Sequence, residues 1–99
     1  MKKLIITGCN GQLGRAMNKV LEGNSEYELV NTDVAELDIT DIAAVLAFVE
    51  KVQPYAIVNC AAYTAVDACE VNQELAYKIN AIGPRNLAIA AEKFDAKLI

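Results

Sequence analysis

Short apolar runs alternate along the chain with longer segments in which apolar residues recur at helical spacing. The predicted strands are residues 4–6, 27–32, 55–58 and 97–99, and the predicted helices are residues 13–21, 42–52 and 73–94. The first apolar run is continuous, as is typical of a strand that is buried on both faces. Strands that alternate with helices predict a Rossmann-like α/β fold, in which a doubly wound parallel sheet of about four strands lies between two layers of helices.

Local signals indicate where the predicted helices begin and end. Gly23 follows the first helix, and glycine tolerates the left-handed conformation that ends many helices. Thr40 and Asp41 predict the start of the second helix, with the threonine hydroxyl as its cap, and Pro54 closes that helix. The chain stops inside the fourth apparent strand, so we expect it to be part of a longer protein.

Composition excludes several classes of protein. The 99 residues are 55% hydrophobic with two Pro and five Gly, which argues against a disordered or collagen-like chain and allows one domain. A net charge of −4 leaves no basic footprint for nucleic acid, and no apolar run is long enough to span a membrane. There is no His, and Cys9, Cys60 and Cys69 are scattered, so neither a metal site nor a disulfide framework is expected. We expect a cytoplasmic domain that binds neither nucleic acid nor membrane.

Three glycines connect the first predicted strand to the first predicted helix. Gly8, Gly11 and Gly14 have a G-x-x-G-x-x-G spacing, one residue longer than the G-x-G-x-x-G fingerprint. The free N–H groups and the dipole of a helix N-terminus favour an anion such as a pyrophosphate. We expect Gly8 to allow the turn, Gly11 to leave room for the phosphates and Gly14 to let the helix pack closely on the sheet. A tight strand–helix turn without a ligand is the alternative.

An acidic residue follows the second predicted strand. Asp33 lies 19 positions beyond Gly14, close to the spacing of about 20 at which such folds place the acid that binds the adenosine ribose. A carboxylate there repels a 2′-phosphate and so favours NAD over NADP. Arg15 complicates this prediction, because its guanidinium is either a partner for a 2′-phosphate or a solvated surface group. We predict that NADH is preferred and NADPH is tolerated.

Four motifs together resemble a known family. They are Thr-Gly-Cys-Asn-Gly-Gln-Leu-Gly at 7–14, Asp38-Ile39 in Leu-Asp-Ile-Thr-Asp, Asn-Cys-Ala-Ala-Tyr-Thr-Ala-Val-Asp at 59–67, and Tyr-Lys-Ile-Asn-Ala-Ile-Gly-Pro-Arg-Asn-Leu-Ala at 77–88. Over its whole length the chain resembles the extended short-chain dehydrogenase/reductases, and within them the reductases of the dTDP-rhamnose pathway. The resemblance implies NADH or NADPH as the cofactor, and the parent protein's activity as reduction of a dTDP-linked 4-keto sugar, its substrate partner.

The resemblance also implies a role for each matching residue. The cofactor pyrophosphate is expected at Gly11, Gln12 and Leu13. The adenine is expected at Asp38, whose carboxylate accepts from the exocyclic amine, and at Ile39, whose backbone N–H donates to a ring nitrogen.

Three residues after the third predicted strand are implied to line the cofactor toward its nicotinamide: Ala62, Tyr63 and Thr64. Their position agrees with the rule that ligands bind at the carboxyl ends of the strands of such a sheet. Tyr63 departs from the His that many relatives have there, although an aromatic side chain beside a ring is physically reasonable. Asp38 could alternatively be a turn residue before Thr40.

A proline lies inside the third predicted helix. Pro84 lacks the N–H that would bond to the Asn80 carbonyl four residues back, so we predict a kink and a free Asn80 carbonyl. In many short-chain dehydrogenases an Asn on this helix takes part in a proton relay, which the resemblance implies for Asn80. A kink that merely fits the helix to the sheet is the alternative.

The chain lacks the residues that carry out the family's chemistry. Reduction there needs a Tyr with a Lys four positions later, and the residues four positions after the four tyrosines are Asn, Asn, Asp and Ala. We therefore expect residues 1–99 to be the N-terminal portion of an NAD(P)-binding Rossmann domain, inactive alone, without the catalytic Tyr/Lys region and the substrate domain.

Other functions remain open at this point. A nucleotide-sugar epimerase or dehydratase would share the same superfamily features. A non-catalytic regulatory subunit that binds a dinucleotide, or a structural nucleotide-binding module, would need no catalytic pair. A homodimer is also left open.

Overall fold

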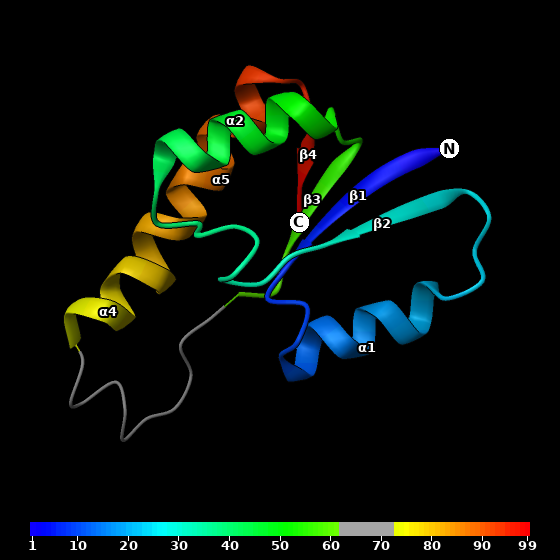
Figure 1. Cartoon of the computed structure of the whole chain (residues 1–99), viewed down its shortest axis with the longest axis horizontal. Coiled ribbons are helices and arrows are strands. Elements are labelled where there is room, and N and C mark those ends of the chain that lie inside the picture. Colours follow the sequence, from blue (N-terminus) through cyan, green and yellow to red (C-terminus); the bar gives the residue numbers. More distant parts are fainter. Residues whose placement is uncertain (62–72) are drawn as a thin grey trace.

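The computed structural model of the chain describes residues 1–61 and 73–99 and has the predicted parallel α/β architecture (Figure 1). The strands are β1 (Lys2–Thr7), β2 (Tyr27–Asn31), β3 (Ala56–Asn59) and β4 (Lys97–Leu98). The helices are α1 (Gln12–Leu21), α2 (Ile42–Val52), α4 (Gln73–Tyr77), the π-helical segment η1 (Lys78–Ile82) and α5 (Gly83–Lys93). The predicted strands and helices are confirmed, with boundaries that differ by no more than two residues.

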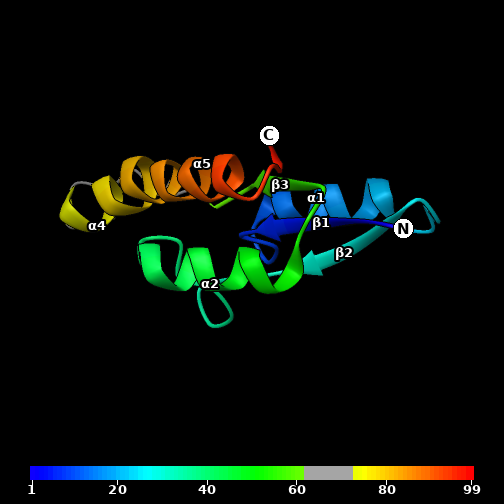
Figure 2. The same ribbon diagram turned by 90° about the horizontal axis from the view of Figure 1, so that it is seen from above.

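All four strands are parallel and lie in the order β2-β1-β3-β4. The chain therefore passes from β1 to β2 on one side and then crosses back over β1 to β3 and β4 on the other side. Right-handed crossovers in opposite directions place their helices on opposite faces of the sheet. Accordingly, α1 lies on one face, while α2 and α5 lie together on the other (Figures 1 and 2).

The larger part of the core lies between the sheet and the pair α2 and α5. Ile5 and Ile57 are fully buried on this face, and successive strand residues alternate, so Leu4, Ile6 and Val58 are buried toward α1. The remaining members of the main core cluster are Leu37, Ile39, Val45, Val49, Leu87, Ala90 and Ala91. Leu37 and Ile39 belong to the connection between β2 and α2, so two of its side chains are buried in the core and fix it against the rest of the fold.

The start of α2 differs from the prediction by one residue. The cap is Asp41, whose carboxylate accepts a hydrogen bond from the Ala44 N–H at 3.2 Å. Thr40 lies one residue before this cap, and its hydroxyl donates to Oδ1 of Asp38. Gln53 ends the helix in the left-handed conformation, at φ 52°, directly before Pro54.

The third helical region runs from Gln73 to Lys93 in three consecutive segments that follow nearly one direction (Figure 2). The effect of Pro84 takes the form of a π-helical segment in place of a simple kink: the Gly83 N–H donates to the carbonyl of Lys78, five residues back. The wider π-helical turn accommodates the missing N–H of the proline. Asn80 has an interaction partner in this structure, and the relay proposed for it stays a prediction.

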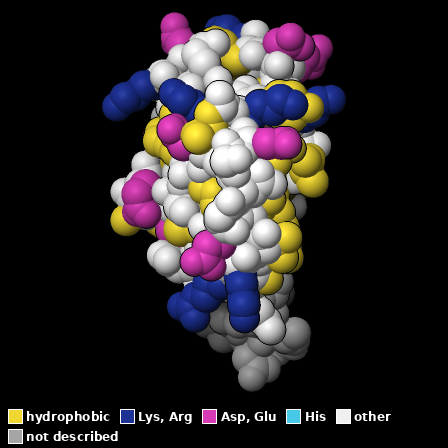
Figure 3. Space-filling model, turned by 90° about the vertical axis from the view of Figure 1, so that its right-hand side faces the viewer, with side chains coloured by type: hydrophobic (Ala, Val, Ile, Leu, Met, Phe, Trp, Pro, Cys, Tyr) yellow, Lys and Arg dark blue, Asp and Glu magenta, His cyan; other side chains and the backbone are white. Residues whose placement is uncertain are grey.

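Charges of both signs share the surface on the side shown in Figure 3, where lysine and arginine side chains are interspersed with acidic ones. In the described part of the chain, none of the helices combines the length and the apolar character needed to cross a membrane.

Candidate functional site

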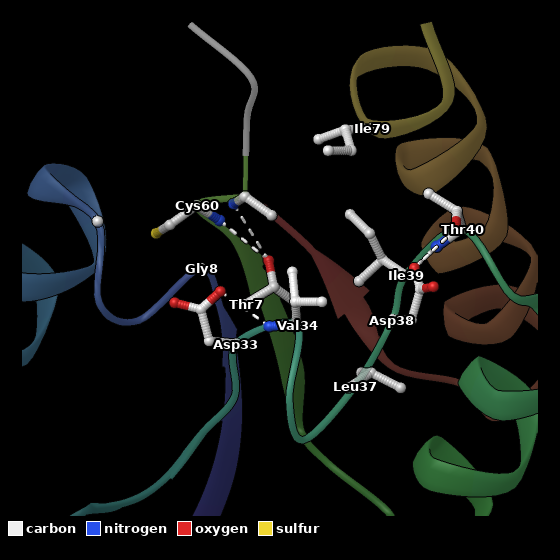
Figure 4. Close-up of a pocket in the computed structure, with 12 residues that line it drawn as sticks. Thr7, Gly8, Asp33, Val34, Leu37, Asp38, Ile39, Thr40, Cys60 and Ile79 are labelled. Carbon is white, nitrogen blue, oxygen red and sulfur yellow. Dashed lines mark hydrogen bonds between the residues drawn. The ribbon is translucent and has the colours of Figure 1, made fainter. Parts of the chain in front are cut away.

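A cavity of about 480 Å³ opens at the carboxyl ends of β1, β2 and β3. Its walls come from Thr7 and the glycine loop, from the segment 33–40 after β2, from Cys60 and Ala61 after β3, and from Ile79 of η1 (Figure 4). It lies where β2 and β3 diverge to opposite sides of β1, the point at which doubly wound sheets bind their ligands. Its volume is in the range of sites for small molecules and cofactors.

The glycine loop is shaped by close backbone contacts. Gly8 has φ +62°, and a Cβ there would lie 2.7 Å from the backbone of Ala61. A Cβ at Gly14 would overlap the Gly8 carbonyl oxygen and lie 2.7 Å from Cα of Cys9. Gly14 therefore lets the start of α1 lie against the backbone of Gly8 and Cys9, and its role in packing the helix on the sheet stays a prediction.

Gly11 differs from the other two glycines of the loop. A Cβ there would meet only the Gly8 carbonyl oxygen, at 3.3 Å, and the residue borders the cavity. Gly11 is also the N-cap of α1, and no side chain in the described part of the chain caps this helix. The start of α1 therefore has no side-chain cap in the described residues, and its N-cap residue borders the cavity.

Asp33 is held at the glycine loop. Its carboxylate accepts a hydrogen bond from the Asn10 N–H at 3.3 Å and from the Val34 N–H at 2.8 Å. The Cys9 N–H donates to the Thr32 carbonyl at 3.0 Å, so the end of β2 and the loop are joined at two places. This puts a carboxylate at the cavity wall, on the same side as Gly8 (Figure 4).

Asp38 stands at the opposite end of the cavity from Asp33 (Figure 4). Its Oδ1 accepts from the Thr40 N–H at 3.0 Å and from the Thr40 hydroxyl at 2.6 Å. These hydrogen bonds, first the one from the hydroxyl, hold the pKa of Asp38 below its ordinary value, with a smaller contribution from the charge of Lys78. The turn interpretation is therefore correct for Oδ1, and the ionised group is an acceptor only.

Ile39 is buried beneath the third helical region. Its carbonyl accepts a hydrogen bond from Nδ2 of Asn86 at 2.9 Å, and Asn86 is itself completely buried. A Cβ at Gly83 would lie 2.5 Å from Cδ1 of Ile39, so the glycine makes room for this side chain. Sequence reasoning missed Asn86, whose only signal is an amide within an otherwise apolar helix face.

A second residue missed by sequence reasoning is Thr7. Its buried hydroxyl donates to Oδ1 of Asn59 at 2.6 Å and accepts from the Cys60 N–H at 3.1 Å. The ends of β1 and β3 are thereby fixed to each other at the cavity wall. Cys60 also lines the cavity, and burial raises the pKa of its thiol.

The remaining predicted residues are not all brought to the cavity. Gln12 and Leu13 are exposed at the start of α1 and do not line it. Ala62, Tyr63 and Thr64 lie outside the described residues. Among residues 1–61 and 73–99, no group of three metal-ligating side chains occurs.

The whole chain matches the family model described as the RmlD substrate binding domain, over residues 1–99. The dTDP-4-dehydrorhamnose reductase of Aggregatibacter actinomycetemcomitans is 40% identical over 99 residues, which cover 100% of this chain and 34% of that protein. Its counterpart in Streptomyces griseus is 40% identical over 95 residues, covering 96% of this chain and 31% of that protein.

Solved structures with the same fold include two of the same name. A dTDP-4-dehydrorhamnose reductase from Clostridium acetobutylicum matches with TM-score 0.92 and 53% identity, covering 97% of this chain and 34% of that one. One from Bacillus anthracis, in complex with NADP, matches with TM-score 0.91 and 46% identity, covering 99% and 35%. This chain therefore spans about a third of the length of these relatives.

Proposed function

The chain belongs to the family of the RmlD substrate binding domain, and from this premise we propose that it is the cofactor-binding part of an NAD(P)H-dependent reductase. The proposed reaction converts dTDP-4-dehydro-rhamnose to dTDP-rhamnose, for nucleotide-sugar and surface polysaccharide biosynthesis. The observation that carries the proposal is one cavity, at the carboxyl ends of the strands, that is walled by the glycine loop and has a carboxylate at each end.

The glycine loop is the proposed pyrophosphate site. The Gly11 position is open to the cavity, and the N-terminus of α1 has no described side-chain cap, which leaves donors and a favourable dipole for an anion. Gln12 and Leu13 are exposed beside it, so we assign their role to backbone N–H groups. Binding of the pyrophosphate by these N–H groups would not require the Gln12 or Leu13 side chain to move.

The segment after β2 is the proposed adenosine site. Asp33 is assigned to the ribose, because its carboxylate is fixed at the cavity wall next to the loop. Asp38 is assigned to the exocyclic amine of adenine, since both of its hydrogen bonds in the described part of the chain end on Oδ1 and leave Oδ2 for a ligand. Ile39 is assigned to a ring nitrogen through its N–H.

The reaction itself is assigned to the full-length protein. The bound cofactor would supply the hydride, and we assign the sugar contacts and the proton donor to residues beyond this chain. Ala62, Tyr63 and Thr64 stay predicted for the nicotinamide side, as does the relay through Asn80. The cytoplasmic location and a homodimer likewise stay predictions.

A chimaeric enzyme tests the proposed function. This chain would replace the matching third of the Clostridium acetobutylicum reductase, with which it shares 53% identity. We expect the chimaera to oxidise NADPH, followed at 340 nm, only when dTDP-4-dehydro-rhamnose is present. The unaltered host enzyme is the positive control. A folded chimaera that binds NADPH and leaves the sugar unreduced would contradict the proposal.

Neutralising Asp33 should shift the preference between the two cofactors. In Asp33→Asn the side chain keeps its shape and an acceptor oxygen but loses the charge that repels a 2′-phosphate. We expect the ratio of NADH to NADPH affinity to fall by about 10-fold, equivalent to about 1.4 kcal/mol. Asp41→Asn makes the same change in charge outside the cavity, at the α2 cap, and should leave the ratio unaltered. Fluorescence titration measures both, and equal ratios in Asp33→Asn and the parent would remove Asp33 from the ribose site.

A further inference from the structure

We propose that Asn86 is a positioning residue for base recognition, which sets the Asp38 carboxylate through the Ile39–Thr40 peptide and thereby selects a purine with an exocyclic amine. The inference rests on the proposed function, because it concerns the adenine end of the same cavity. It gives Asn86, which does not line the cavity, a part in base selection beside Asp38.

The argument begins with a single peptide plane. The Ile39 carbonyl accepts from Nδ2 of Asn86 at 2.9 Å, and the Thr40 N–H of the same peptide donates to Oδ1 of Asp38 at 3.0 Å. A trans peptide is rigid and planar, with its C=O and N–H directed oppositely. Whatever fixes the carbonyl on the buried side therefore fixes the direction of the N–H that holds Asp38.

Asn86 is itself held in one orientation. Its side chain is completely buried in α5, and Nη2 of Arg85 donates to its Oδ1 at 3.3 Å. With a donor on its oxygen and an acceptor on its nitrogen, the amide is defined by its partners. Gly83, one turn earlier, lets the Ile39 side chain lie directly against the helix. The contacts of Asn86 and Gly83 with Ile39 thus fix the segment around residue 39, at the Asp38 end of the cavity, against α5.

The carboxylate that results is suited to one kind of base. Hydrogen bonds from Thr40 occupy Oδ1 and keep the group ionised, so it only accepts. Adenine presents an amine at its six position, whereas hypoxanthine presents a carbonyl there and a protonated ring nitrogen beside it. A fixed acceptor next to a backbone donor complements adenine and opposes hypoxanthine. If the peptide were free to rotate, this discrimination would weaken.

The experiment compares NADH with its deamino analogue, in which hypoxanthine replaces adenine. Titration of the chain should give a parent affinity for NADH at least about 10-fold higher than for the analogue, as expected for a hydrogen bond to a charged acceptor. Asn86→Leu removes the donor at similar volume, and Asn86→Ala removes it without placing a side chain against the carbonyl. We expect either variant to reduce the ratio to about 2 or less. Leu4→Ala, a core change on the α1 face and outside the α2–α5 core cluster, should lower stability and keep the parent ratio.

The outcomes separate this inference from the proposed function. A parent that binds neither dinucleotide would overturn the proposed function and the inference together. A parent that discriminates, with folded Asn86→Leu or Asn86→Ala discriminating equally well, would overturn the inference alone. A parent that binds both dinucleotides equally would also overturn it, because there would be no base recognition to position. If the ratio of NADH to analogue affinity also fell in Leu4→Ala, the effect at Asn86 would be one of general stability and the inference would be overturned.

Discussion

Gly8→Ala is expected to destabilise the fold by about 3 to 5 kcal/mol, whereas Gly23→Ala should cost only about 1 to 2 kcal/mol. The two glycines have similar positive φ angles, +62° at Gly8 and +79° at Gly23. The strain of placing a Cβ on left-handed backbone is therefore common to both substitutions. What differs is the surrounding structure.

At Gly8 a Cβ would lie 2.7 Å from Cα and N of Ala61 and 2.8 Å from the carbonyl carbon of Cys60. These are backbone atoms, so no side chain rotation relieves the overlap. At Gly23 nothing lies within 4 Å of the added atom. The difference between the two variants thus isolates the close approach of the β1 and β3 ends, which forms the floor of the cavity.

Urea unfolding of the two variants measures this difference. The midpoint should fall far more in Gly8→Ala than in Gly23→Ala, with similar slopes if the transition stays two-state. Gly8→Ala should also lose NADPH binding under conditions where it is folded, because the overlap displaces Gly8 and Ala61, which both line the cavity. Equal losses of stability in the two variants would mean that the approach at Gly8 is not structurally required.

The strands and the glycine loop could be predicted because their signals are local. A strand buried on both faces is a continuous apolar run, and Ile5 and Ile6 are both completely buried. A turn at positive φ requires glycine or a strained residue, and Gly8 has this conformation. Burial and backbone sterics act at the residue itself, so the pattern reveals them without knowledge of the fold.

The contacts that order the 33–40 segment could not be predicted, because they join distant parts of the chain. Asn86 donates a hydrogen bond to Ile39, which lies 47 positions earlier in the chain. The identity of a helical Asn does not by itself tell whether its side chain is buried or solvated. The sequence predicts Thr40 as the cap of α2, whereas the cap is Asp41, because both residue types cap helices. In the structure the Thr40 hydroxyl donates to Asp38, and the Asp41 carboxylate accepts from the Ala44 N–H at the start of the helix.

Gly11→Val is expected to lower the affinity for NADPH by at least about 100-fold, or about 2.7 kcal/mol, while the fold stays intact. Gly11 has φ −77° and ψ 175°, an extended conformation that valine adopts without strain. Its Cβ would meet only the Gly8 carbonyl oxygen, at 3.3 Å. The substitution therefore adds a Cβ and two methyl groups to the cavity wall at the proposed pyrophosphate position, and little strain elsewhere.

The size of the expected effect follows from what the methyl groups displace. A pyrophosphate must approach the N–H groups at the start of α1 closely, because hydrogen bonds to an anion weaken steeply beyond about 3.2 Å. Gly11→Ala adds only the Cβ and should give an intermediate loss of affinity. Adenosine, which has no phosphate, should bind Gly11→Val and the parent alike, measured by NMR chemical-shift titration. If Gly11→Val kept the parent's affinity for NADPH, or lost adenosine as well, the glycine loop would not be the pyrophosphate site.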